Sequence, residues 1–494
     1  MAYLTRHNGA TYTGGMKRYR IALLLLLIVL LFPAAVAADA PPFVPTLAPV
    51  VRGQDPQNPH PATTDIPPLA ADYTLTATVG DGEADGAIHA TGTEQVRLTN
   101  TGKQAVPAVT FNVAAVHYGW FTLDSGTIDG VPAAVDQAEV RVSFPEWPAL
   151  APGDTRTVGF TFHLDIRDGG DGFDVTRRDG DILRLGYWFP MLSDDHGYHD
   201  QFDAVYTATG NFHVTLTAPA AQTLISTGVV QHRETSGART TYTIDAPNVR
   251  DFAALLSSSY HMTQGITKDN VRVEVDAVPS DLAVSSLTEE DMLAYAIHAI
   301  EWMSATIGPY PYPVFHVADA GLTMPGGVEF PTLVMIGTRI RGVSMRTLVS
   351  HETSHQWFFG LLGTHPQTET WVDEGAATLF EEAINEGIDV PVTLPRSLPC
   401  PVNITVWDHS VSDRDHYYCV YTGGAKVYAT IRDTMGTDRF VAALHDLYTQ
   451  DRYGIITGRD LLTVFQQHSA TDLRPALHAY LTYDWLDALP PPGG

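Results

Sequence analysis

The residues most able to do chemistry stand in HETSHQWFFGLLGTHPQTETWVDEG, a stretch that begins at His351. His351 and His355 are four residues apart, so on a helix both imidazoles would lie on one face and could reach the same metal ion. Zinc suits a site of two histidines and one carboxylate, with a fourth position open to water. Glu352 stands between the histidines, where a general base could take a proton from that water.

The third ligand has to come from another segment. Glu374 follows the turn at residues 363–366 and begins a second helical stretch, which an antiparallel arrangement would bring back over the two histidines. Its neighbour Asp373 is expected to point elsewhere, and Thr378, one turn later, to support the ligands. The HExxH pattern is only moderately specific by itself, because a core helix with two hydrogen-bonded histidines would have the same sequence.

The composition bounds what kind of protein carries this stretch. The chain has 494 residues, of which 44% are hydrophobic and 10% aromatic, enough for two or three domains with a buried core. It has 29 basic and 56 acidic residues, which gives a net charge of −27. Such a surface repels phosphate backbones, which argues against nucleic acid as a partner, and it does not help binding to anionic lipid.

The N-terminus has the features of a targeting segment. The basic segment Met16–Arg20 precedes a long apolar run, and A-x-A cleavage sites end at Ala37 and Ala40. Residues 1–40 are therefore predicted to be a signal peptide. The alternative is an uncleaved membrane anchor formed by residues 21–38, which are just long enough to span a bilayer. In either case the chain is predicted to be exported, as an extracellular or cell-surface protein.

The chain has two cysteines, Cys400 and Cys419. In an exported chain an isolated pair predicts one disulfide, the alternative being two unpaired buried thiols. A bridge across a loop of this length would stabilise the fold by about 3 kcal/mol.

The rest of the chain divides by its patterning. Residues 41–69 hold nine prolines and predict a semi-rigid spacer. Residues 70–264 alternate apolar and polar side chains between short turns, which predicts an antiparallel, sandwich-like β-domain. Within them, the acidic loop Asp168–Asp174 resembles one calcium-binding repeat, although a solvated turn is favoured. Residues 265–490 are mostly helical, so the predicted fold class is α+β.

The order of motifs resembles the aminopeptidase N-type zinc metallopeptidases, a gluzincin family. In this chain HETSH is followed by 18 residues and then by Glu374 within WVDEG. GGVEF, at residues 326–330, is similar to the family's exopeptidase motif Gly-x-Met-Glu-Asn, with Val in place of Met and Phe in place of Asn. IGPYPY (residues 307–312) and NVRDFA (residues 248–253) are similar to further family landmarks, and the resemblance covers roughly residues 70–490.

The resemblance implies a thermolysin-like catalytic domain with one Zn²⁺ per chain. His351, His355 and Glu374 would be the zinc ligands, and Glu352 the general base. Tyr421, in YTGGAKV, lies where the family's Tyr-Glu-Lys-Gly motif has its tyrosine, and it would donate a hydrogen bond to the oxyanion of the intermediate.

The same resemblance implies an aminopeptidase that acts on peptides with a free N-terminus. Glu329 would pair with the α-ammonium group of the substrate, and Gly326 and Gly327 before it would allow close approach. The following run, residues 331–336, is expected to be a sheet edge that binds an extended peptide. A second amine-binding residue from the β-domain is not identified, and WFPML (residues 188–192) is the nearest landmark.

Two other functions fit the same motifs. One is a different zinc hydrolase, either an endopeptidase or an epoxide hydrolase, and the other is a non-catalytic peptide-binding surface protein.

The chain is expected to be a short form without the C-terminal helical domain of its larger relatives, with an open site that admits longer peptides. The remaining histidines in loop-like contexts are not expected to be ligands: His196, His199, His365 and His416.

Overall fold

The computed structural model describes the following residues: 66–82, 86–168, 175–194, 206–285, 287–322, 326–339 and 344–493. The predicted signal peptide or anchor and nearly all of the spacer lie outside them, as do residues 169–174 of the acidic loop and the two histidines His196 and His199. Within the described ranges, no helix is long and apolar enough to cross a membrane.

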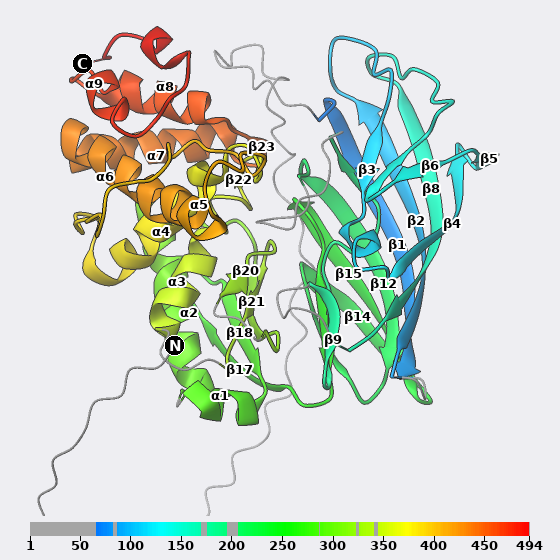
Figure 1. Ribbon diagram of the computed structural model, residues 1–494. Coiled ribbons are helices and arrows are strands. Elements are labelled where there is room, and N and C mark those ends of the chain that lie inside the picture. The colour runs from blue at the N-terminus through cyan, green and yellow to red at the C-terminus, as the bar shows by residue number, and fades with distance from the viewer. Residues whose placement is uncertain are drawn as a thin grey trace, which may run out of the picture. The chain divides into compact units, whose positions relative to one another are not determined.

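The N-terminal domain is built on an eight-stranded sheet with the order β14-β15-β12-β1-β2-β8-β4-β5 (Figure 1). Buried and exposed residues alternate strictly along β2, as a strand with one face on the core requires. Most neighbouring strands pair antiparallel, but β1 and β12 pair in parallel. The bounds are β1 (Leu69–Gly82), β2 (Ile88–Asn100), β4 (Phe121–Ile128), β5 (Val131–Ala133), β8 (Thr155–Ile166), β12 (Gly210–Pro219), β14 (Val229–Ser236) and β15 (Arg239–Val249).

Two four-stranded sheets complete this domain, with the orders β13-β16-β10-β9 and β11-β3-β7-β6. Every residue of β10 and β16 is buried, so both faces of these strands are covered. The prediction of a sandwich-like β-domain ahead of a helical domain is confirmed. The bounds are β3 (Thr110–Asn112), β6 (Asp136–Ala138), β7 (Arg141–Ser143), β9 (Thr176–Asp179), β10 (Ile182–Leu185), β11 (Met191–Ser193), β13 (Thr223–Ser226) and β16 (Ala254–Ser257).

The second domain opens with a five-stranded sheet of order β17-β18-β19-β21-β20. Its strands are β17 (His261–Ile266), β18 (Arg272–Ala277), β19 (Val314–Asp319), β20 (Gly327–Val328) and β21 (Leu333–Ile336). The chain passes from one sheet to the next between β16 and β17, so the predicted boundary at 264/265 falls inside β17. The expectation that residues 331–336 form a sheet edge is wrong: β21 lies between β19 and β20, and β20 is the edge among the described strands.

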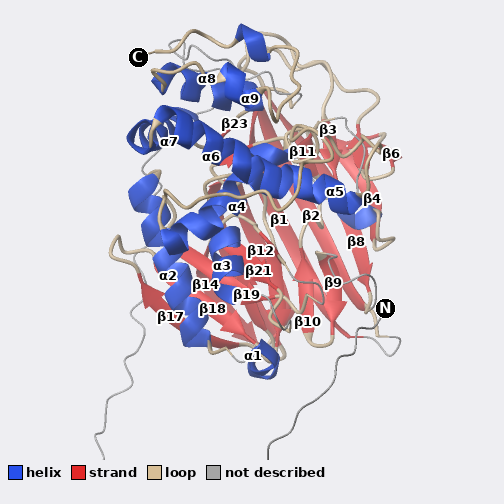
Figure 2. Cartoon of the chain, turned by 60° about the vertical axis from the view of Figure 1, so that its left-hand side comes forward, coloured by secondary structure: helices blue, strands red, loops and turns tan. Residues whose placement is uncertain are grey.

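Helices make up most of the remaining chain (Figure 2). Helix α2 contacts β17, β18 and β19, and α3 contacts both α2 and α4. The bounds are α1 (Pro279–Ser285), α2 (Glu289–Thr306), α3 (Met345–Ser354), α4 (Thr370–Glu386), α5 (Asp413–Tyr418), α6 (Gly424–Met435), α7 (Thr437–Asp451), α8 (Gly458–His468) and α9 (Arg474–Leu477). A two-stranded sheet, β22 (Leu362–Gly363) with β23 (Gly454–Ile455), joins the loop after α3 to the loop after α7.

One arginine joins the two domains. Arg250, of the NVRDFA motif, is buried, and its guanidinium donates to three backbone carbonyls: Phe359 (2.8 Å), Thr207 (2.6 Å) and Gly454 (2.8 Å). Gly363 is required beside it, because a Cβ there would lie 2.1 Å from the guanidinium carbon. The motif therefore fixes the β-domain against the segment that follows the HExxH helix.

Candidate metal centre

Helix α3 holds the first two predicted ligands. It begins after Ser344, whose side chain accepts a hydrogen bond from the Thr347 amide at 3.2 Å and so caps the helix. His351 and Glu352 lie in its last turns, and His355 caps its C-terminal end. Beyond the helix, the Trp357 indole donates to the Gly308 carbonyl at 2.9 Å, which ties the IGPYPY segment to this end.

The three predicted ligands converge on one point. Nε2 of His351 and Nε2 of His355 are 3.2 Å apart, and Oε2 of Glu374 lies 3.3 Å from the first and 3.4 Å from the second. Ligand atoms about 2.1 Å from a tetrahedral zinc ion are separated by about 3.4 Å. The donor atoms, two imidazole nitrogens and one carboxylate oxygen, are those that zinc prefers, so the residues present fit the metal.

Each histidine is oriented by a contact on its other ring nitrogen. Nδ1 of His351 lies 2.7 Å from Oε2 of Glu381, two turns beyond Glu374 on α4. Nδ1 of His355 lies 3.1 Å from the Phe358 carbonyl. Such contacts fix the tautomer that presents Nε2 to a metal.

Asp373 is not one of the three converging ligands, but it contacts one of them. It is buried, its Oδ1 lies 3.6 Å from Nδ1 of His355, and its Oδ2 accepts from Thr364 at 3.0 Å. The helix does turn it away from the three ligand atoms, but toward the outer nitrogen of a ligand. Thr378, expected to support the ligands, makes no hydrogen bond through Oγ1 among the described residues.

The approach of α6 to α4 brings in Tyr421. The two helices meet at glycines: a Cβ on Gly375 would lie 2.7 Å from Cα of Gly424, so neither position tolerates a side chain. Tyr421 stands just before α6, in a π-helical segment, Cys419–Gly423. Its hydroxyl donates to Oε1 of Glu374, and its ring stacks on that of His351 with centroids 6.0 Å apart.

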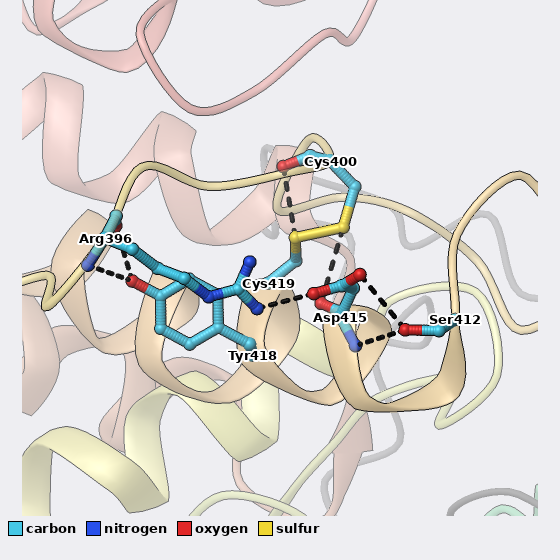
Figure 3. Close-up of a disulfide and its surroundings, with 6 residues drawn as sticks. All are labelled: Arg396, Cys400, Ser412, Asp415, Tyr418 and Cys419. Atoms are coloured by element: carbon cyan, nitrogen blue, oxygen red, sulfur yellow. Dashed lines mark hydrogen bonds and ion pairs between the residues drawn. A yellow bond between two sulfur atoms is a disulfide. The ribbon is translucent and has the colours of Figure 1, made fainter.

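The predicted disulfide between Cys400 and Cys419 is present and ends two residues before Tyr421 (Figure 3). Nearby, Arg396 pairs with Asp415 at 2.5 Å, and its backbone carbonyl accepts from the Tyr418 hydroxyl at 2.6 Å. These contacts join the loop before α5 to the end of that helix.

Glu352 is buried against strand β20, at a position where only glycine fits. A Cβ on Gly327 would lie 2.6 Å from both Cγ and Cδ of Glu352 and 2.7 Å from the Met335 carbonyl. The sequence predicted that this glycine makes room for substrate. In the structure the Glu352 side chain itself occupies that room.

Glu329, predicted to pair with the substrate's α-ammonium group, lies close to one of the ligands. It is buried, and its Oε1 is 3.9 Å from Nδ1 of His355. Gln356, one residue past the second ligand, holds the backbone that follows Glu329. Its Nε2 donates to the Phe330 carbonyl at 3.1 Å, and its Oε1 accepts from the Thr332 amide at 2.8 Å. Since Thr332 has a φ of 63°, this side chain fixes a turn that the backbone would not favour alone.

The residue that replaces the family's Asn packs against the β-domain. The Phe330 ring lies 5.1 Å from that of Tyr187, which directly precedes WFPML. A Cβ on Gly186 would lie 2.5 Å from the Phe330 ring. The two residues that precede WFPML therefore lie beside Phe330, which follows Glu329.

The charges at the site favour a cation between the ligands. Burial would raise the pKa of Glu374, but its contacts with His351 and His355 lower it to about 2. Burial would lower the pKa of His355, yet its contacts with Glu374 and Asp373 raise it to about 9. Burial raises the pKa of Glu352 to about 7, although the two histidine charges lower it. Without a metal, the carboxylates stabilise protons on the imidazoles. The same negative charges would stabilise a divalent metal ion.

Two residues that support the ligands were not predicted from the sequence. Glu381 is seven residues after Glu374, and this spacing, which places both on the same helix face, is the one sequence feature that could have indicated its role. For Gln356, only its place in HQWFFG could have indicated a supporting role. His365 pairs with Asp194 at 3.2 Å, and neither it nor His416 belongs to a candidate metal group in the described residues.

No protein-family model matches the chain. Among curated proteins, the chain is similar to Tricorn protease-interacting factor F2 of Thermoplasma acidophilum, with 22% identity over 216 residues, covering 38% of this chain and 28% of that protein. The factor F2 of Thermoplasma volcanium is 21% identical over 214 residues, covering 38% of this chain and 27% of that protein. The chain thus spans little more than a quarter of the length of these relatives.

Solved structures match much more of the chain. A two-domain M1 zinc metallopeptidase variant bound to L-tryptophan has a TM-score of 0.64 at 16% identity, covering 86% of this chain and 96% of that one. A variant from Deinococcus radiodurans bound to a Tyr-Ser-Ala substrate gives 0.63 at 17% identity, with the same coverage. The chain therefore has the two-domain fold of the M1 zinc metallopeptidases.

Proposed function

We propose that this chain is a zinc-dependent aminopeptidase that removes N-terminal residues from peptides. The observation that carries the proposal is the triangle of His351 Nε2, His355 Nε2 and Glu374 Oε2, with edges of 3.2 to 3.4 Å. Glu352 and Glu329 lie beside it, and both form a second close group with His355. A core helix with hydrogen-bonded histidines would not need these additional buried carboxylates around one point.

The three triangle residues would hold one zinc ion. Bound zinc supplies Lewis acidity, which acidifies a water molecule and polarises a carbonyl group at neutral pH. Glu352 belongs to α3, like His351, but its carboxylate is not part of the triangle. It would take the proton from the attacking water and return it to the leaving amine.

Glu329 would select substrates with a free N-terminus. Its buried carboxylate lies close to His355, so a peptide whose α-ammonium group pairs with it would place its first peptide bond near the triangle. Edge strand β20 precedes it and has one side without a strand partner among the described residues. An extended peptide could add there as a further strand.

Tyr421 would stabilise negative charge on the substrate oxygen. Its hydroxyl donates to Oε1 of Glu374 in the structure, within reach of the same centre. Turning this donor to the developing oxyanion would contribute about 10²- to 10³-fold in kcat, the usual effect of one such hydrogen bond.

The test uses the tripeptide Tyr-Ser-Ala, the substrate named for a similar structure, with a free and with an acetylated N-terminus. We expect chelator-sensitive release of tyrosine from the free peptide and no cleavage of the acetylated one. The variant Glu352→Gln, checked for folding by circular dichroism, should lose about 10²- to 10⁴-fold in rate. Cleavage of the acetylated peptide would point to an endopeptidase, and absence of any chelator-sensitive cleavage to a binding protein.

We also propose that the chain is exported, either secreted or held at the cell surface by residues 21–38. The basic and apolar N-terminal segments support this, as does the disulfide, because such bonds persist in oxidising compartments. Fractionation of expressing cells with N-terminal sequencing tests it. A new N-terminus after Ala37 or Ala40 supports cleavage, and an intact one in the membrane fraction supports an anchor. Full-length protein in the cytoplasm contradicts export.

A further inference from the structure

A second group of metal-ligating side chains shares no residue with the triangle. It belongs to β18 and β19, two paired strands of the five-stranded sheet (Figure 2). Glu274 and Asp276 are two residues apart on β18 and so share one face of the sheet. His316, on β19, is paired directly with Glu274 in the parallel register. These three residues are called the β18–β19 cluster below.

The cluster faces away from helix α2. Gly265 on β17 is paired with Val273, and a Cβ on Gly265 would lie 2.8 Å from Ile297 and 3.4 Å from Leu293 of α2. Val273 therefore lies on the α2 face, and the cluster, one residue out of phase, on the opposite face. Apolar helix packing thus does not account for the polar side chains there.

The spacing of the donor atoms suits one metal ion. Nδ1 of His316 lies 3.3 Å from Oε2 of Glu274 and 3.9 Å from Oδ2 of Asp276. Ligand atoms about 2.1 Å from one ion are separated by about 3.4 Å at a tetrahedral angle and by about 4.2 Å when opposite each other. Both distances fall within or next to that range.

Two of these atoms have no hydrogen-bond partner among the described residues. Oδ2 of Asp276 makes no hydrogen bond among the described residues, although only 4% of the side chain is exposed. Nδ1 of His316 likewise makes none, on a side chain that is 12% exposed. A buried carboxylate oxygen without a partner is costly, and such atoms usually mark a group that the protein binds.

We propose that the β18–β19 cluster binds a divalent transition-metal ion, such as Zn²⁺ or Mn²⁺, as a second site separate from the catalytic one. An imidazole with two carboxylates suits these ions, whereas Ca²⁺ prefers oxygen ligands alone. Arg272 pairs with Oε1 of Glu274 at 2.5 Å and leaves Oε2 toward His316. Glu274 is 18% exposed, so an ion can enter from that side. The ion would fasten β18 to β19 and stabilise the sheet.

The experiment separates this site from the proposed catalytic one. The full chain carrying His351→Ala and His355→Ala lacks two ligands of the triangle, so metal bound to it reports on other sites. After loading with Zn²⁺ and dialysis, we expect one equivalent of metal by elemental analysis and a melting temperature that rises with added Zn²⁺. No bound metal in this variant overturns the proposal, and contacts among the three side chains alone then explain the cluster.

A second comparison assigns the metal to the cluster. Adding Asp276→Asn and His316→Gln to that variant should remove the equivalent and the thermal shift. The matched control is His261→Gln, on neighbouring strand β17, whose histidine pairs with Glu289 at 2.6 Å outside the cluster; it should keep both. Equal metal in all three proteins overturns the assignment. Because neither readout needs peptidase activity, failure of the proposed function does not affect the outcome.

Discussion

Replacing Glu381 by glutamine is expected to weaken zinc binding without removing any ligand. The Glu381 carboxylate lies 2.7 Å from the outer nitrogen of His351 and is not part of the triangle. Its carboxylate favours the tautomer that presents Nε2 to the metal, and its negative charge makes the imidazole a stronger donor. Glutamine keeps an oxygen acceptor of similar size but removes the charge.

The magnitude follows from the asymmetry of the two histidines. The outer nitrogen of His355 lies beside the Phe358 carbonyl and the Asp373 carboxylate rather than beside Glu381, so its own support does not change, and only one of three ligands is affected. Loss of such an outer contact typically lowers metal affinity by about 10- to 100-fold. This corresponds to about 1.4 to 2.7 kcal/mol of binding free energy. Alanine at this position should fall at the upper end, because it removes the acceptor as well.

The assay is competition for Zn²⁺ against a chelator of known affinity, read by peptidase activity and by elemental analysis. Glu382→Gln is the matched control, since it removes one carboxylate from the adjacent, exposed position of the same helix and should leave the dissociation constant unchanged. If Glu381→Gln binds Zn²⁺ as tightly as the unchanged protein, Glu381 does not orient the ligand. If Glu382→Gln weakens binding equally, the effect is one of general charge.

Three further predictions concern activity and stability. Gly327→Ala should lower kcat for the free tripeptide by up to about 10²- to 10⁴-fold, the usual contribution of a general base, because its Cβ would displace the Glu352 carboxylate; unchanged kcat would show that the carboxylate has room. Arg250→Met should lower the free energy of unfolding by about 3 kcal/mol or more, since three buried carbonyls lose their donor; a smaller loss in urea denaturation would mean that water replaces the guanidinium. Replacing Cys400 and Cys419 by serine should cost about 3 kcal/mol in the same measurement, and unchanged stability would contradict a structural role for the bridge.

Much of the fold could be predicted from the sequence because it depends on patterns within short segments. Alternation of apolar and polar residues predicted strands in the β-domain, and along β2 buried positions do alternate with more exposed ones. The spacing of His351 and His355 predicted a shared helix face, and the isolated cysteine pair predicted the bridge that is observed. In each case the prediction depends on the periodicity of one segment or on a single pair of cysteines.

The sequence misled where packing between distant segments decides. The composition of residues 331–336 suits an edge strand as well as an inner one. They form an inner strand only because residues 327–328 pair with their outer side. Asp373 was expected to point elsewhere, because a helix turns it away from its neighbour Glu374. It contacts His355 because α3 packs against α4, which helix periodicity cannot anticipate.

The sequence by itself determined the kinds of donor atom and their local spacing: two histidines one turn apart, a glutamate between them, and further carboxylates in a fixed order along the chain. Only the tertiary structure decided that these atoms meet within 3.4 Å, that Gly327 makes room for Glu352, and that Glu381 supports a ligand. It also joined Glu274 and Asp276 to His316 on the next strand. The physical reason is that helix and strand periods fix directions over a few residues, whereas distances between segments depend on how their side chains pack.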